Sequence, residues 1–399
     1  MSGKECFEIL DKIFLPKKME NIENIRGYTM KYGHIVENLK EYDGFEVPES
    51  AIVDEVLVSY FKEPMSYTTE NMCEINTHGG NIVVKKILEL CLKNGAEMAE
   101  PGEFTKRAFL NGRIDLLQAE SVIDIIDAKS ERELKAGMNQ LEGRVSKEIH
   151  DIKQKIMDVM VNVEVDIDYP EYDVEEVTNT EINEMLDVVI ADLSRLEKSF
   201  DNGKILKDGV KTAIIGKPNA GKSSLLNCIL NEERAIVTEI EGTTRDTIEE
   251  FVTVEGVPLK LIDTAGIREA KDEVEKIGIT KSKEIAKDAD LIIAIFDSSK
   301  DLTDEDKEIL DIIKNKTAIV VLNKMDLLNK IDENMAEIKN VSKYIVKMST
   351  LEQKGIDDLY KSIGNLFSME EISLDNTIVI TNIRHKNLIS KALNSCREA

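Results

Sequence analysis

An eight-residue segment in the second half of the chain restricts its fold more than any other feature. Residues 216–223 read Gly-Lys-Pro-Asn-Ala-Gly-Lys-Ser, after the apolar run Thr212–Ile215 and before Ser224–Asn227. The spacing G-x-x-x-x-G-K-[ST] between a buried strand and a helix is typical of a phosphate-binding loop, whose backbone N–H groups converge at the helix N-terminus. An ordinary glycine-rich turn between a strand and a helix is the alternative.

The side chains of such a loop have predictable tasks. Lys222 would reach the β and γ phosphates of a nucleotide, and Ser223 would ligate Mg²⁺. The further nucleotide-binding residues that we expect here are Asn219, Ala220, Gly221 and Ser224. The loop therefore predicts a site for a nucleoside triphosphate and its metal ion.

Three more motifs follow in the order typical of GTPases. They are Thr243-Thr244-Arg245-Asp246, then Asp263-Thr264-Ala265-Gly266 after the strand Pro258–Ile262, then Asn323-Lys324-Met325-Asp326 after the strand Ala318–Leu322. Asp263 would hold Mg²⁺ through a water molecule, and the Gly266 N–H would face the γ-phosphate. The series predicts a GTPase with a doubly wound sheet of alternating strands and helices.

Asp326 is the residue predicted to recognise guanine. Its carboxylate can accept hydrogen bonds from the N1–H and the 2-amino group of guanine, and adenine has neither donor, so ATP is disfavoured. Taken alone, the motif formed with Asn323 and Lys324 would also suit a solvated turn. Its place in the ordered series favours a guanine site.

Two positions depart from the usual GTPase pattern. Many GTPases orient the attacking water with a glutamine after the Asp-x-x-Gly turn, but this position is Ile267, which has no hydrogen-bonding side chain. The following segment, Arg268–Gly278, offers several carboxylates, and each is also compatible with a solvated surface acid. The second departure is Thr350 in Ser349-Thr350-Leu351, where GTPases place a last guanine-contacting loop that often reads Ser-Ala.

The amino-terminal half carries motifs that go beyond a GTPase core. They are Thr77-His78-Gly79-Gly80, the segment Pro101–Arg113, and Asp115-Leu116-Leu117-Gln118-Ala119-Glu120. Together with residues 216–227, 241–246 and 263–269, they give a chain that resembles the tRNA-modification GTPase family called MnmE or TrmE over nearly its whole length. The resemblance implies a multidomain α/β and α+β protein with a folate-binding-type α+β domain, a helical bundle, and an inserted Ras-like P-loop GTPase domain.

A chain of 399 residues is also longer than one typical domain. We expect a tetrahydrofolate-binding and dimerisation domain over residues 1–112, a discontinuous helical domain over 113–208 and 376–399, and a GTPase domain over 209–375. Apolar residues at three- and four-residue spacings predict the helical bundle. They are Leu117, Val122, Ile125, Ile126, Leu134, Met138, Leu141 and Val145.

For catalysis, the resemblance implies roles for Lys222, Thr244 and Glu275. Glu275 would position the hydrolytic water through a bridging water, and Thr244 would close onto Mg²⁺ beside Ser223. A K⁺ ion would supply positive charge near the phosphates, so that hydrolysis is K⁺-assisted and coupled to pairing of two GTPase domains. The implied K⁺ ligands are Asn219, Thr238, Ile240 and Thr243. The implied nucleotide contacts in these loops are Thr238, Glu239, Ile240, Glu241, Gly242, Thr243, Thr244, Asp263, Thr264, Ala265 and Gly266.

The resemblance also implies a role in tRNA modification. With the flavoprotein partner MnmG (GidA), which carries FAD, family members form a 5-aminomethyl-type group, carboxymethylaminomethyl or aminomethyl, on the wobble uridine of certain tRNAs. They use a one-carbon tetrahydrofolate, and Glu74 and Arg113 match two folate-binding positions of the family. Without the family, Glu74 is an exposed strand residue, Arg113 a helix-surface cation and His78 a turn histidine.

Two other functions stay open at this point. One is a GTP-dependent switch for ribosome assembly, whose GTPase core would look much the same. The other is a truncated fragment that hydrolyses GTP without modifying tRNA, because family members continue beyond both ends of this sequence, to a terminal Cys-Ile-Gly-Lys. We therefore expect the chain to be trimmed at both ends.

The charge of the chain bears on how it meets tRNA. The formal net charge is -25, and the run Glu164–Glu184 holds nine acids and no Lys or Arg. Because nucleic-acid-binding surfaces are basic, we expect tRNA to be held through a partner or across a homodimer. The sequence has no apolar run of about eighteen residues and no C-x-x-C spacing, which predicts a cytoplasmic protein without a membrane span, disulfide framework or zinc site.

Overall fold

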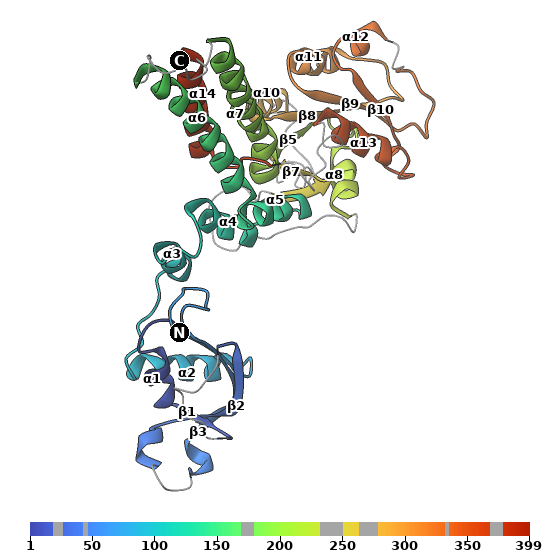
Figure 1. Ribbon diagram of the computed structural model, residues 1–399. Helices are drawn as coiled ribbons and strands as arrows, with labels where there is room; N and C mark the ends of the chain where they lie inside the picture. Colours follow the sequence, from blue (N-terminus) through green and yellow to red (C-terminus); the bar gives the residue numbers. More distant parts are fainter. Residues whose placement is uncertain are drawn as a thin grey trace. The chain divides into compact units, whose positions relative to one another are not determined.

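The structure is a computed structural model that describes residues 1–18, 27–42, 47–168, 179–231, 250–262, 278–331, 335–367 and 378–399. Its chain divides into two compact units, Met1–Ile123 and Asp124–Ala399 (Figure 1). The helix α4, Leu116–Ile126, contains the point of division.

The first unit is built on a four-stranded antiparallel sheet in the order β1-β2-β3-β4. Its strands are Phe14–Pro16, Thr29–Val36, Ile52–Phe61 and Met72–Asn76, and its helices before the division are α1 Cys6–Asp11, α2 Asn81–Lys93 and α3 Glu103–Leu110. Short 3-10 helices cover Leu39–Tyr42 and Glu49–Ala51. Val56, Val58 and Tyr60 alternate toward the core along β3, as the two-residue period of a strand requires, and pack with side chains of α1 and α2.

The second unit contains a six-stranded sheet in the order β10-β9-β8-β5-β7-β6. The strands are β5 Val210–Ile215, β6 Glu250–Val254, β7 Val257–Leu261, β8 Leu291–Asp297, β9 Ala318–Asn323 and β10 Tyr344–Lys347. Every pairing is parallel except the β6–β7 hairpin at one edge. This is the doubly wound sheet expected from the sequence, and the prediction of the fold class is confirmed.

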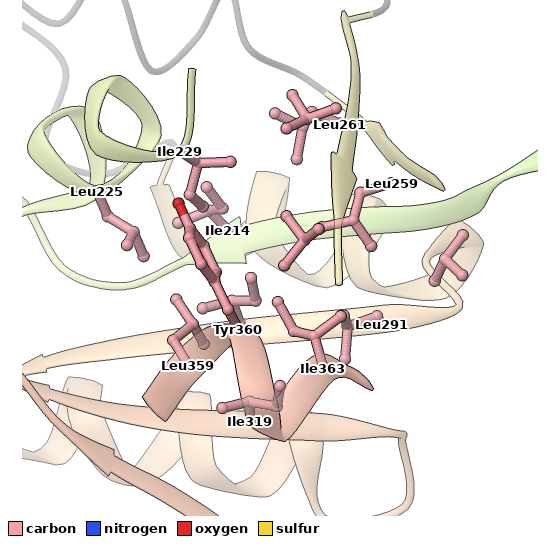
Figure 2. Packing of buried hydrophobic residues seen from close by; sticks show 14 of the residues in the cluster. Ile214, Leu225, Ile229, Leu259, Leu261, Leu291, Ile319, Leu359, Tyr360 and Ile363 are labelled. Carbon is pink, nitrogen blue, oxygen red and sulfur yellow. The ribbon is translucent and has the colours of Figure 1, made fainter. Parts of the chain in front are cut away.

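Helices cover both faces of this sheet. On one face lie α8 Lys222–Asn231 and α13 Ile356–Leu366, and on the other α10 Gly278–Asp288, α11 Asp304–Ile313 and α12 Ala336–Lys339. Each face of the sheet has its own apolar core. Neighbouring residues of β5 point to opposite faces, Ile214 into the first core and Ile215 into the second. Figure 2 shows the first core, where Tyr360 extends from α13 toward Ile229 of α8. Burial of each such large apolar side chain contributes about 1.5–3 kcal/mol.

The remaining helices of the second unit pack against one another (Figure 1). They are α5 Glu131–Leu141, α6 Arg144–Asp168, α7 Asn179–Asp208 and α14 Ile383–Glu398, and both α6 and α14 pack on α7. The strand β5 starts two residues after α7 ends. The Ile380 N–H donates a hydrogen bond to Ser199 Oγ at 3.2 Å, so the chain returns to the same helix after the six-stranded sheet.

The predicted helices are present over residues 116–145, but not all of the apolar residues that predicted them are buried. Leu134 and Met138 are 43% and 40% exposed, whereas Glu133 and Gly137 of the same helix are buried. Gly137 leaves room for Ile125, whose Cγ1 lies 2.9 Å from where a Cβ would stand. Close approach of α4 at this glycine therefore outweighs the apolar pattern.

In the described ranges, no helix is both long enough and apolar enough to span a membrane.

Candidate nucleotide-binding site

The phosphate-binding loop begins at the carboxyl end of β5 and runs directly into α8, as predicted. Gly216 is pressed against β8, because an added Cβ would lie 2.5 Å from the Ile295 carbonyl oxygen. Asn219 and Gly221 have φ angles of 61° and 110°, in the left-handed region that asparagine and glycine tolerate best. This backbone turns the loop around the N-terminus of α8, where unpaired N–H groups favour an anion.

Lys222 occupies the inside of this loop. Its Nζ donates hydrogen bonds to the carbonyl oxygens of Gly216 and Lys217 at 2.6 and 2.7 Å. Burial lowers the pKa of this ammonium to about 8, since removal from water disfavours the charged form. A bound polyphosphate would supply negative charge beside this buried ammonium. Lys222 is therefore suited to bind phosphate.

Asn323 links the phosphate-binding loop to the end of the sheet where a base would be recognised. This fully buried side chain donates from Nδ2 to the Ala220 carbonyl at 2.9 Å and to Thr350 Oγ1 at 3.2 Å, and its Oδ1 accepts the Thr350 N–H at 3.0 Å. Three loops thus meet on one amide. The Thr350 hydroxyl takes part in a hydrogen bond that an alanine there could not make.

Asp326 is exposed at the mouth of the same site. One carboxylate oxygen, Oδ1, accepts a hydrogen bond from Ser349 Oγ at 2.6 Å. This contact orients the carboxylate, which can still accept hydrogen bonds from paired N–H donors of a base. Leu351, in contrast, is 83% exposed.

Asp297 is a site residue that the sequence reasoning missed. It ends β8 in register with Asn323, and its Oδ2 accepts a hydrogen bond from Lys324 Nζ at 2.7 Å, while Ser299 donates to Oδ1. Burial raises the pKa of Asp297, but the hydrogen bonds from Lys324 and Ser299 outweigh it and the net pKa is lowered. The signal available in the sequence was the acid that directly ends the apolar run Leu291–Phe296.

The structure brings together the predicted residues Asn219, Ala220, Gly221, Lys222, Ser223, Ser224, Asn323, Lys324, Asp326, Ser349 and Thr350 around one end of the sheet. Apart from the described Leu351, the other residues predicted for the nucleotide site lie outside the described residues: Thr238, Glu239, Ile240, Glu241, Gly242, Thr243, Thr244, Asp263, Thr264, Ala265, Gly266 and Glu275. Of the predicted metal ligands, the exposed Ser223 at the start of α8 and the exposed Asn219 are described. Within the described ranges, no three His, Cys, Asp or Glu residues cluster as metal ligands.

The first unit has a cavity of about 510 Å³ with Glu74 on its wall, together with Cys73, Ile87 and Phe104. Glu74 is an exposed residue of β4. Without the family resemblance, Arg113 was interpreted as a helix-surface cation, but it lies between α3 and α4. Its guanidinium is 4.8 Å from the centre of the Tyr67 ring. It donates a hydrogen bond to the Tyr67 carbonyl at 2.9 Å, so two backbone segments meet there.

His78 follows β4 and is held by a single acid. Its ring Nδ1 lies 2.8 Å from Asp54 Oδ1, and its backbone N–H donates to Asp54 Oδ2 at 2.9 Å. Burial opposes ionisation of Asp54, yet these hydrogen bonds lower its pKa overall. The arrangement explains the position of His78 as a structural contact between β3 and the turn after β4.

Comparison with known proteins covers the whole chain. The profile of the MnmE helical domain matches residues 116–399, and the profile of the GTP-binding protein TrmE N-terminus matches residues 1–113. Curated relatives named tRNA modification GTPase MnmE include those of Thermoanaerobacter pseudethanolicus (51% identity, 100% of this chain, 85% of the relative), Clostridioides difficile (48%, 100%, 84%) and Bacillus subtilis (44%, 100%, 85%). Among solved structures, the G domain of the T. maritima FeoB iron transporter matches 39% of this chain and 98% of its own at 26% identity, with a TM-score of 0.29.

Proposed function

The chain belongs to the MnmE (TrmE) family of tRNA modification GTPases, and from this premise we propose that it binds and hydrolyses GTP at the loop of residues 216–223 and serves tRNA modification. The observation that carries the proposal is the side chain of Asn323, which joins the phosphate-binding loop to the loop of Ser349 and Thr350. A triphosphate on Lys222 and a purine beside Asp326 could then be held in one site.

Guanine is the base that this site favours. Asp326 offers a carboxylate held by Ser349, which suits the paired N–H donors of guanine, and a site with such a group rejects a base that lacks the donors. The proposal predicts that GTP is bound far more tightly than ATP. Asp326→Asn should weaken this selectivity, as measured by competition of the two nucleotides against a fluorescent GDP.

For hydrolysis we propose Mg²⁺ on Ser223 and Thr244, and K⁺ on Asn219, Thr238, Ile240 and Thr243. When bound, the two cations supply positive charge beside the phosphates. Ser223 and Asn219 fit these roles, because a hydroxyl and an amide oxygen are ligands that such cations accept, and both side chains are exposed at the loop. Lys222 holds the phosphates, and Glu275 positions the water through a second water.

The test is GTP turnover by the chain in K⁺ and in Na⁺ at matched ionic strength. We expect faster turnover in K⁺, and a further increase with protein concentration if two GTPase segments pair. Glu275→Ala should lose turnover and still bind GTP. Equal rates in both salts at high protein concentration would contradict the role of K⁺ while leaving GTP hydrolysis intact.

Beyond the nucleotide, we propose that the chain acts as a homodimer with the flavoprotein MnmG (GidA), which supplies FAD, to form the aminomethyl-type group on the wobble uridine of certain tRNAs. A one-carbon tetrahydrofolate would be bound near Glu74, a residue that lines the cavity of the first unit, with Arg113 as a second contact. Mass spectrometry of tRNA from cells that carry this chain as their only copy tests the proposal. Absence of the modified uridine would support a GTP-hydrolysing fragment instead.

A further inference from the structure

Lys217, the second residue of the phosphate-binding loop, makes contacts that the loop motif does not require. Its Nζ lies 2.6 Å from Asp306 Oδ2 and donates a hydrogen bond to Thr303 Oγ1 at 2.8 Å. Asp306 lies in the first turn of α11, and its Oδ2 also accepts the N–H and the hydroxyl of Thr303, each at 2.9 Å. The two charged side chains are only 19% and 5% exposed.

A buried ion pair of this kind fixes the positions of its two side chains more than it stabilises the fold. Taking both charges out of water costs about as much as their attraction returns, but a partner left alone is unfavourable. The ammonium of Lys217 is therefore confined to the N-terminus of α11. The ion pair thus links the Lys217 segment of the loop to α11.

The backbone of Lys217 contacts Lys222, the residue proposed to bind the phosphates. The Lys217 carbonyl accepts a hydrogen bond from Lys222 Nζ at 2.7 Å and the N–H of Ala220 at 3.3 Å. The preceding Gly216 is pressed against Ile295 of β8, where a Cβ would lie 2.5 Å from the carbonyl oxygen. The position of the Lys217 carbonyl is thus restricted in two ways. The preceding Gly216 packs on β8, and the Lys217 side chain pairs with α11.

We propose that Lys217 is a positioning residue of the GTPase site, whose ion pair with Asp306 holds the carbonyl that orients the ammonium of Lys222 toward the phosphates. The inference deepens the proposed GTP hydrolysis and rests on it. It assigns α11 a part in the reaction, because small displacements of a positioned group reduce rates strongly.

The first test measures GTP turnover by the full chain and its variants. Lys217→Met removes the ammonium and keeps the apolar stem, and we expect kcat/KM to fall about tenfold. Lys217→Arg should retain most of the activity, because a guanidinium can also pair with Asp306. The matched control is Lys283→Met, which removes a 3.5 Å ion pair between α10 and Glu308 of α11 and should leave turnover unchanged.

The second test separates positioning from simple structural support. Affinity for a fluorescent GDP is measured for Lys217→Met alone, Lys222→Ala alone and the double variant. Positioning predicts that the loss caused by Lys217→Met disappears when Lys222 is already absent, because coupled residues are not additive. Should Lys217→Met fail to fold, Asp306→Asn, which keeps an oxygen for Thr303, takes its place in the cycle.

The inference is overturned by parental turnover in Lys217→Met, or by the same fold loss of GDP affinity in both backgrounds. A parent chain that binds GDP but does not hydrolyse GTP would contradict the proposed function instead, and the binding cycle would still decide the role of Lys217.

Discussion

The ammonium of Lys222 is buried against two carbonyl oxygens, with a pKa lowered to about 8. Bound phosphates favour the protonated form and raise this pKa, so above about pH 8 nucleotide binding must take up a proton. We therefore predict that GDP affinity is constant below this pH and falls by up to about tenfold per unit above it. Titration with a fluorescent GDP from about pH 7 to pH 9 checks this.

Lys222→Arg is the control for that profile. Arginine stays charged throughout this range, so any decline that remains in the variant comes from the base or the rest of the site. A parent profile as flat as that of Lys222→Arg would show that the lysine is already charged when free.

At the base-recognising end, Asp297 holds Lys324, whose φ of 66° is a strained backbone for a lysine. Asp297→Asn keeps the shape and removes the charge, and it should weaken GDP binding about threefold to tenfold by releasing Lys324. The control is Asp301→Asn, which removes the exposed pair with Lys330 at 2.9 Å and should change nothing. Equal affinities of both variants would argue against a role for Asp297.

Among the elements, Gly203 of α7 shows a tertiary contact overriding local preference. In a helix interior, Gly→Ala normally stabilises by up to about 1 kcal/mol. Here the added Cβ would lie 2.1 Å from the Ile380 carbonyl oxygen, so we predict that Gly203→Ala lowers the free energy of unfolding by about 2–4 kcal/mol. Denaturant unfolding measures it, with Gly79→Ala as control because nothing lies within 4 Å of the added Cβ there.

A stabilised Gly203→Ala variant would mean that the segment around Ile380 is not held against α7. A close contact at another glycine shows a limit of sequence reasoning. The strands β5, β7, β9 and β10 and the loop before Lys222 were predictable, because each of these strands is an apolar run followed by a motif. The buried face of α5 was not, since it depends on the notch at Gly137 that only the packed structure reveals.

The same reason separates the predicted from the unpredicted site residues. Asn323 and Asp326 belong to a local motif that can be recognised from its residues and from its place in the series of GTPase motifs. Asp297 and Asp306 act through partners 27 and 89 positions away, Lys324 and Lys217, so local spacing does not show which residues they pair with. Glu275 remains a prediction from the family resemblance, since it lies outside the described residues.

For the whole molecule, the dominant property is a formal net charge of -25. Phosphates of tRNA are repelled by such a surface, so we predict that the chain alone binds tRNA no more tightly than about 10 µM at physiological salt. Filter binding with and without a basic partner measures this. Tight binding by the chain alone, with a steep salt dependence, would contradict this prediction.

The way the nucleotide-binding segment joins α7 limits how it can move. The chain leaves the helix after Asp208 and returns to it at Ser199 and Gly203, through hydrogen bonding and close packing of Ile380. A segment that is attached to one helix at two places can move little, except by rotating about the line that joins the two attachments. We therefore expect a rotation of the sheet to displace α7 and, through their packing on it, α6 and α14.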